Sequence, residues 1–387
     1  MKYTIYYFTG TGNTERAAGL LRAQLEEAGH TVGLQRIGPD TIPPSTAAEE
    51  DECMVIAFPV YSWAPPKIVK QFIRRIPRGR NRGSTAAVLA VDGGGGYQAA
   101  AQACRMLSRR GYRVFLSARA GYADNWRQMM NPPDEENAAA LNTEGDRAVQ
   151  AFARSLLGGE PSHYRISRIN TVWSWSIGLL FAAVGRRVLA AFFIADESCT
   201  SCGLCQRTCP VQAIRMVPAG SVAVIETAGM GTDGADTAAD GKTRKRNAAE
   251  KKPAEKNAAA GSPRLLPEWR GSCESCNRCI NICPVQAVNT SIFRMVAGVV
   301  MIAFFILLLL RTFNAAVLPM IPPGLPGLSL FVFLTKAVLI LAAHHSAAVL
   351  MNPFCRAVGK IPGMRKIMVK SFNKNFRQYL APGFRPR

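Results

Sequence analysis

Two cysteine runs contain the residues whose types and spacing point most directly to chemistry. Both follow the pattern C-x2-C-x2-C-x3-C-P, and together they hold eight of the eleven cysteines in the chain. The first run comprises Cys199, Cys202, Cys205 and Cys209, and the second comprises Cys273, Cys276, Cys279 and Cys283. Thiolates at this spacing on a tight loop can converge on one inorganic core, and the pattern is typical of iron–sulfur cluster binding.

Zinc and disulfide bonds are the alternative uses of such cysteines. Zinc sites usually take two paired ligands from each of two knuckles, and disulfide frameworks belong mainly to short secreted chains. This chain has 387 residues, and its first strand leads into a Gly/Thr turn without the cleavage site of a signal peptide. The repeated run therefore favours iron–sulfur clusters over either alternative, in a reducing cytoplasm.

The duplicated run resembles that of the dicluster ferredoxins, over about Phe192 to Val288. This resemblance implies two [4Fe-4S] clusters with crossed ligation, because the fourth cysteine of each run binds the other cluster. One cluster would be held by Cys199, Cys202, Cys205 and Cys283, and the other by Cys273, Cys276, Cys279 and Cys209. The gap between the runs is unusually long, and the composition of 219–262 (Ala, Gly, Lys, Glu and Asp) predicts a disordered insertion.

An anion-binding turn is predicted near the N-terminus. Lys2–Phe8 has the composition of a buried strand, a turn rich in Gly and Thr follows, and a helix pattern then continues to Ala28. Backbone N–H groups at a helix N-terminus favour phosphate, although the dinucleotide spacing G-x-G-x-x-G is lacking here. The turn resembles the phosphate loop of flavodoxins, which bind FMN. Its residues are Thr9, Gly10, Thr11, Gly12, Asn13 and Thr14.

Further strands and helices alternate through the first 160 residues. The strands are expected at Cys53–Phe58, Thr85–Val91 and Tyr112–Ala120, and the helices at Pro66–Ile76, Gln98–Arg110 and Asp134–Leu157. This succession predicts an α/β fold, a flavodoxin-like doubly wound parallel sheet in the order 2-1-3-4-5, with FMN at the switch point. Loops at the carboxyl ends of strands offer further candidate FMN-binding residues, namely Tyr61, Trp63, Gly94, Gly95 and Tyr97. The aromatic residues among them could stack on the flavin or simply pack on the fold.

Apolar segments follow each redox domain. The stretch 161–191 is expected to connect the domains as an amphipathic, docked segment, because spanning a membrane here would separate the flavin from the clusters. Residues 192–290 would form the small α+β dicluster domain, and 291–351 a two-helix transmembrane hairpin. The turn between the two apolar stretches is uncharged, whereas 352–387 is a basic tail, so the tail and the redox domains are expected on the cytoplasmic side.

The net charge of +21 comes mostly from two basic segments, Lys242–Lys256 and 352–387. Beside apolar helices, such charge suits an anionic inner membrane leaflet better than nucleic acid. Lys336, His344 and His345 lie in the second apolar stretch and could line a quinone or haem site, although packing is the simpler interpretation.

The order of segments resembles bacterial flavodoxin–ferredoxin fusion proteins. The resemblance implies a membrane-anchored iron–sulfur flavoprotein that passes electrons between FMN and two [4Fe-4S] clusters, and on to a redox protein or quinone. Two alternatives stay open: a membrane-bound quinone or small-molecule reductase, and a maturation factor that delivers electrons without a substrate of its own.

Overall fold

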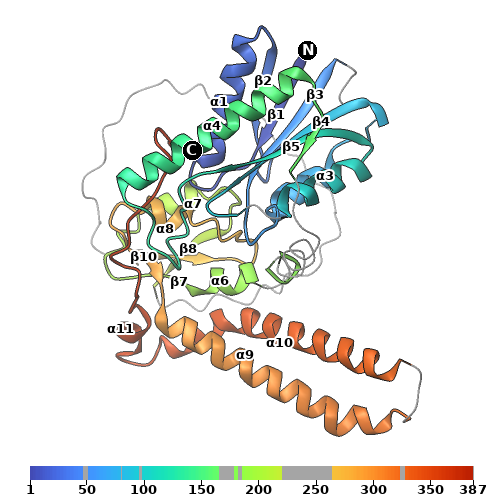
Figure 1. The fold of residues 1–387 in the computed structure, drawn as a ribbon. Helices are drawn as coiled ribbons and strands as arrows, with labels where there is room; N and C mark the ends of the chain where they lie inside the picture. The colour runs from blue at the N-terminus through green and yellow to red at the C-terminus, as the bar shows by residue number, and fades with distance from the viewer. Residues whose placement is uncertain are drawn as a thin grey trace, which may run out of the picture.

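The computed structural model describes residues 1–46, 51–79, 81–95, 98–164, 178–181, 185–219, 264–322 and 327–386. Tyr97, most of the connecting segment and nearly all of the predicted insertion lie outside these ranges. Figure 1 shows three tiers: an α/β sheet, a smaller region that contains the cysteine runs, and a long helical hairpin that projects from the far side of that region.

A parallel sheet forms the first tier. In the described part of the chain its strand order is β2-β1-β3-β4-β5-β6, which confirms the predicted order 2-1-3-4-5 and adds a two-residue strand at one edge. The strands are β1 (Lys2–Tyr7), β2 (Thr31–Arg36), β3 (Glu52–Pro59), β4 (Asn81–Asp92), β5 (Tyr112–Gly121) and β6 (Ser162–His163). The central strand β3 is buried on both faces, as expected of a parallel strand covered by helices.

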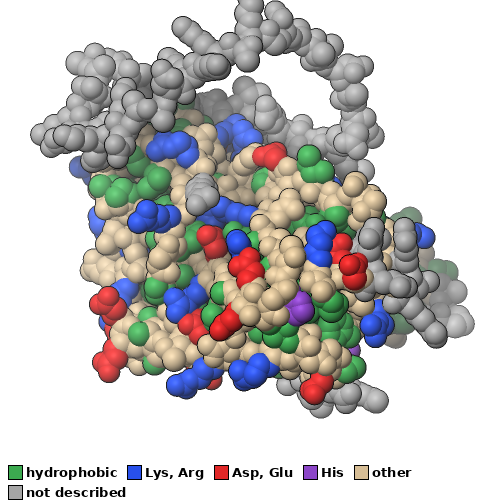
Figure 2. All heavy atoms as spheres, turned by 90° about the horizontal axis from the view of Figure 1, so that it is seen from above, with side chains coloured by type: hydrophobic (Ala, Val, Ile, Leu, Met, Phe, Trp, Pro, Cys, Tyr) green, Lys and Arg blue, Asp and Glu red, His purple; other side chains and the backbone are tan. Residues whose placement is uncertain are grey.

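Two pairs of helices cover the two faces of the sheet. The helices are α1 (Asn13–Glu27), α2 (Lys67–Arg75), α3 (Ala99–Arg109) and α4 (Glu135–Gly158). Helices α1 and α4 pack on one face and share a core with Tyr3, Ile5 and Val55, whereas α2 and α3 pack on the other. Figure 2 shows the molecule from above, and on the described residues visible there basic and acidic side chains are interspersed.

The second tier is built from two short antiparallel strand pairs and the cysteine loops. Strand β7 pairs with β10, and β8 pairs with β9. The elements are α6 (Arg186–Phe192), β7 (Phe193–Ala195), α7 (Leu204–Arg207), β8 (Ile214–Pro218), β9 (Leu265–Trp269), α8 (Arg278–Ile282) and β10 (Val288–Thr290). Strand β8 ends at Pro218 and β9 begins at Leu265, so the predicted insertion lies in the sequence between these two strands and between the two cysteine runs.

Two long apolar helices form the hairpin of the third tier. Helix α9 (Ile292–Thr312) continues through short π and 3-10 turns to Met320, and α10 (Leu328–Val358) returns beside it. Among the described residues, these two segments are long and apolar enough to cross a membrane, and their side chains are largely exposed. At the base of the hairpin, Met351 and Cys355 pack against Ala191 and Ile194.

His344 and His345 do not point to a shared partner. His344 Nδ1 lies 2.8 Å from the carbonyl oxygen of Ile340, whereas His345 Nδ1 lies 3.1 Å from Arg187 Nη1. This divergence agrees with packing rather than with joint binding of one iron.

The basic C-terminal segment folds back onto the redox domains. After α11 (Met364–Met368) the chain rises from the base of the hairpin past the cysteine loops to the sheet (Figure 1). Asn373 is fully buried and donates hydrogen bonds to the carbonyl oxygens of Arg127 and Gln128. The segment expected as a separate tail is therefore docked, because its polar and aromatic side chains find partners on both redox domains.

Candidate functional site

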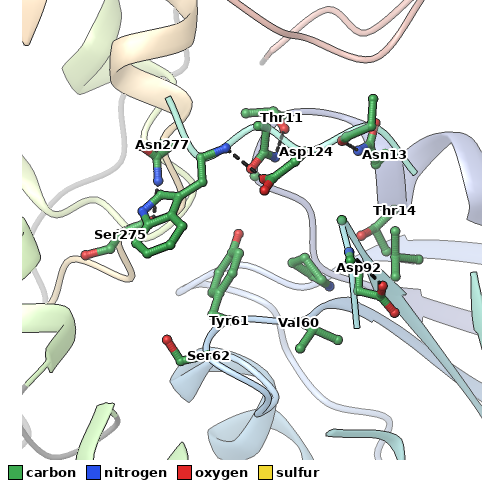
Figure 3. A pocket seen from close by; sticks show the side chains of 18 of the residues that line it. Thr11, Asn13, Thr14, Val60, Tyr61, Ser62, Asp92, Asp124, Ser275 and Asn277 are labelled. Atoms are coloured by element: carbon green, nitrogen blue, oxygen red, sulfur yellow. Dashed lines mark hydrogen bonds between the residues drawn. The ribbon is translucent and has the colours of Figure 1, made fainter. Parts of the chain in front are cut away.

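A cavity of about 480 Å³ opens at the carboxyl ends of the central strands (Figure 3). The predicted residues that line it are Thr9, Gly10, Thr11, Asn13, Thr14, Tyr61, Trp63, Gly94 and Gly95. Gly12 belongs to the same turn without lining the cavity, and Tyr97 lies outside the described residues. The order of the parallel strands thus brings loops that are far apart in sequence to one switch-point crevice.

The turn after β1 has the geometry of an anion cradle. Thr9 Oγ1 accepts a hydrogen bond of 3.1 Å from the backbone N–H of Gly12, whose φ of 110° is left-handed. The hydroxyl of Thr14, in the first turn of α1, is buried and has no hydrogen-bond partner among the described residues. An anion at the N-terminus of α1 would supply that partner, so the turn fits a phosphate.

Two further loops are fixed tightly around the cavity. Asp92 Oδ1 accepts hydrogen bonds from the N–H groups of Gly94 (3.1 Å) and Gly95 (2.8 Å), while its carboxylate pairs with Arg119 at 2.6–2.9 Å. The loop after β3 turns back at Tyr61, which exchanges backbone hydrogen bonds with Ala64. The loop geometry is therefore set before any ligand arrives.

Tyr61 projects from its turn into the cavity (Figure 3). Its hydroxyl is buried and has no hydrogen-bond partner among the described residues. Burial, followed by repulsion from Cys276, raises the pKa of Tyr61 well above its ordinary value. The side chain therefore presents a neutral aromatic ring to whatever occupies the cavity.

The second cysteine run forms one wall of this cavity. Ser275 and Asn277 line it directly. A Cβ atom on Gly10 would lie 3.0 Å from the carbonyl oxygen and 3.2 Å from the Cβ atom of Cys276. Sequence reasoning missed this contact, because nothing in the spacing of either motif connects the two loops.

Buried charged residues join the cysteine run to the sheet. Arg278 donates hydrogen bonds to the carbonyl oxygens of Gly10 (2.5 Å), Thr9 (2.9 Å) and Thr208 (2.7 Å), and burial lowers the pKa of its guanidinium. Glu274 accepts from the N–H groups of Lys67 and Ile68 at the start of α2, and burial raises the pKa of its carboxyl. Glu274 and Arg278 lie between cysteines of the second run. Because they bond to backbone groups after β1 and at the start of α2, they hold this run against the sheet domain.

The predicted crossed ligation would divide the eight cysteines into two sets of four, each with three members from one run and one from the other. We call Cys199, Cys202, Cys205 and Cys283 the exposed set, and Cys273, Cys276, Cys279 and Cys209 the buried set. In the exposed set, burial and then repulsion from Cys199 and Cys202 raise the pKa of Cys205 to about 12, and Cys283 adds to the effect. In the buried set, burial and then repulsion from Cys209 raise the pKa of Cys276 to about 11.

This chemistry fits iron–sulfur clusters. Neutral thiols are favoured in such crowded sites, and a cationic iron core would reverse that preference by stabilising the thiolates. Donors already point at the sulfurs: the N–H groups of Ala213 and Ala287 lie 3.2 Å from the Sγ atoms of Cys209 and Cys283. Trp269 Nε1 donates to Cys279 Sγ at 3.4 Å. Within the described ranges, no group of three or more His, Cys, Asp or Glu is placed to hold a single metal ion.

The two sets differ in their access to solvent. Cys273, Cys276 and Cys279 are only 7–8% exposed, whereas Cys202 is an exposed residue. The buried set lies against the anion cradle through Cys276, and the exposed set reaches the surface of the protein through Cys202.

Comparison with known proteins supports the cysteine motif directly. Residues 192–215 match a 4Fe-4S binding domain. The match covers the first run. No curated protein matches the chain.

Solved structures that match include three flavodoxins. An archaeal flavodoxin is 14% identical, with 39% of this chain and 99% of that chain covered at a TM-score of 0.26. The two-electron reduced flavodoxin of Megasphaera elsdenii is 20% identical (38% and 98% covered, TM-score 0.27), and flavodoxin 2 of Bacillus cereus is 18% identical (40% and 99% covered, TM-score 0.27). These scores are low, so the flavodoxin-like arrangement rests on the strand order and the switch-point cavity.

Proposed function

We propose that this chain is a membrane-anchored electron-transfer protein that binds FMN in the cavity and a [4Fe-4S] cluster at each cysteine set. The observation that carries the proposal is the contact between Gly10 of the anion cradle and Cys276 of the buried set. Because Ser275 and Asn277, on either side of Cys276, also line the cavity, a flavin there and a cluster at the buried set would be close neighbours that could exchange electrons. FMN supplies two-electron chemistry that can proceed in single steps, and each cluster carries one electron.

The residues for FMN are those of the cradle and the two loops beside it. Thr9–Thr14 would hold the phosphate, with the unpartnered Thr14 hydroxyl as one donor. Tyr61 and Trp63 line the cavity and would pack against the ring system, while Gly94 and Gly95 offer close backbone approach.

We infer that the two cysteine sets bind two clusters with crossed ligation. The electrostatic coupling of Cys276 to Cys209 and of Cys205 to Cys283 supports a fourth thiol from the opposite run in each set. The domains that follow from this proposal are a flavin domain at 1–160 and a dicluster domain at 192–290, interrupted by the insertion. Cys202 brings the exposed set to the surface, where a redox partner could reach it.

Membrane anchoring rests on the two apolar helices and the charges at their base. The turn between the helices carries no charge, whereas exposed lysines gather around α11, at Lys360, Lys366 and Lys370. Basic residues at one end of a hairpin favour the cytoplasmic side and anionic lipid. The proposal therefore places both redox domains in the cytoplasm, with a redox protein or quinone as the partner and with no role for nucleic acid.

Anaerobic purification from membranes in detergent tests the proposal. About eight irons, matching sulfide and one FMN per chain are expected, with EPR signals from reduced clusters. Colourless protein, or protein that carries zinc in place of iron, would contradict it. Zinc analysis of the same preparation distinguishes a wrong metal from a cluster lost during handling, because lost clusters leave free thiols.

A further inference from the structure

We propose that the C-terminal segment 379–384 is a positioning element of the flavin phosphate loop, so that tight binding of FMN depends on a docked C-terminus. The inference rests on the proposed FMN site. It concerns a part of the chain about 370 residues away from that loop, which Figure 1 shows rising from the base of the hairpin to the sheet.

Tyr379 and Ala381 hold the loop through hydrogen bonds. The hydroxyl of Tyr379, itself 8% exposed, lies 2.9 Å from Asn13 Oδ1 and 3.0 Å from Asn142 Oδ1. Asn13 Nδ2 donates in turn to the carbonyl oxygen of Ala123, so the Asn13 amide is held at both ends. The N–H of Ala381 donates to the carbonyl oxygen of Thr11 at 2.8 Å.

Phe384 covers the outer side of the same loop. A Cβ atom on Gly12 would lie 2.6 Å from the Cβ and Cγ atoms of Phe384 and 2.8 Å from the Cβ atom of Ala381. The guanidinium carbon of Arg278 lies 5.1 Å from the centre of the Phe384 ring, and Arg278 also donates to the carbonyl oxygens of Thr9 and Gly10. The loop at Gly12 is therefore confined between the C-terminal segment and the second cysteine run.

The position of this segment predicts an effect on the phosphate alone. Tyr379, Ala381 and Phe384 do not line the cavity as described, so they would not touch the flavin ring. They restrict the loop whose N–H groups and hydroxyls face the phosphate, and a restricted loop loses less conformational entropy when the ligand binds. Without them, the affinity for FMN should fall, whereas the affinity for riboflavin, which lacks the phosphate, should not.

The test measures both flavins on the full-length protein in detergent, with its clusters loaded and its flavin removed. Quenching of flavin fluorescence gives the Kd values for FMN and riboflavin in the parent protein and in Phe384→Ala, Tyr379→Phe and Phe372→Ala. Phe372 is an exposed aromatic residue of the same C-terminal region that packs only on Phe376 among the ring contacts described, and it serves as the matched control. The iron content of each variant checks that the cluster region is intact.

We expect the Kd for FMN to rise about tenfold in Phe384→Ala and severalfold in Tyr379→Phe, with the Kd for riboflavin unchanged throughout and Phe372→Ala like the parent. Unchanged FMN affinity in both site variants would overturn the inference while leaving the FMN site standing. An equal loss for both flavins would overturn it as well, because the segment would then support the whole cavity. A parent protein that binds neither flavin refutes the proposed FMN site and, with it, this inference.

Discussion

The two cysteine runs have the same spacing and the same local backbone, yet they sit in different surroundings. Left-handed residues recur at equivalent places, at Ser201 and Ser275 and again at Gln212 and Gln286. The residues between the cysteines differ: Thr200 and Leu204 in the first run correspond to Glu274 and Arg278 in the second.

These differences decide what each run faces. Glu274 and Arg278 reach the start of α2 and the anion cradle, and Asn281 donates to the carbonyl oxygen of Asn125 at 3.0 Å. At the equivalent place the first run has Arg207, which is exposed and bonds within its own loop to the carbonyl oxygen of Cys202. The cysteine spacing is thus the same in both runs, while the intervening side chains decide whether a run faces the cavity or the solvent.

Removal of the fourth cysteines should have the largest effect on this comparison. Cys209→Ala should destroy the buried cluster and Cys283→Ala the exposed one, and each variant should retain about four of about eight irons. A brief exposure to an iron chelator then identifies the survivor, since iron in the exposed set should be lost faster. If the iron remaining in Cys209→Ala were the more resistant, ligation would be uncrossed.

Exchange of one intervening residue should have the next largest effect. Arg278→Leu gives the second run the residue of the first and leaves three carbonyl oxygens without their donor. We expect a loss of about 2–4 kcal/mol in the free energy of unfolding, because buried groups would lose charged hydrogen bonds. Urea unfolding followed by flavin fluorescence measures it, and electron transfer from dithionite-reduced flavin to the clusters should slow in parallel.

The reverse exchange, Leu204→Arg, is the matched control. Leu204 is only partly buried, so an arginine there can extend into solvent, and the stability should change by less than about 1 kcal/mol. Comparable losses in both variants would mean that the runs do not differ in the way that their contacts indicate.

Contact between the cradle and the buried set can be tested with one methyl group. In Gly10→Ala the new Cβ atom would lie 2.8 Å from the Tyr61 hydroxyl and 3.0 Å from the Cys276 carbonyl oxygen, so the loop must shift by a few tenths of an ångström. We expect the Kd for FMN to rise at least tenfold, or about 1.4 kcal/mol. Gly19→Ala, in α1 and outside the cavity lining, where the new atom meets nothing within 4 Å among the described residues, should stay within about twofold of the parent.

The parts of this structure that follow from local patterns could be predicted from the sequence. The strands, their order, and the loops that line the cavity depend on hydrophobic periodicity and on rules of parallel sheets, and the 4Fe-4S motif of the first run depends on spacing. Which set is buried could not be predicted, since Arg278 owes its role to carbonyl groups about 270 residues away. The docking of the C-terminal segment could not be predicted for the same reason. Its basic composition describes charge, whereas the docking depends on the fit between Phe384 and Gly12.

The smallest expected effect concerns the solvent side of the exposed set. Arg207 is exposed beside Cys202, so it should attract anionic and repel cationic electron acceptors that approach there. In Arg207→Glu, oxidation of the reduced protein by ferricyanide should slow about two- to threefold at low salt, and oxidation by hexaammineruthenium should speed up by a similar factor. Both differences should vanish in about 1 M salt, where the screening length is about 3 Å.

Arg22→Glu makes the same charge change on α1, away from both cysteine sets, and should leave both rates unchanged. Were the two variants to respond alike, electrons would leave by a route other than Cys202, and the exposed set would lose its distinction from the buried one.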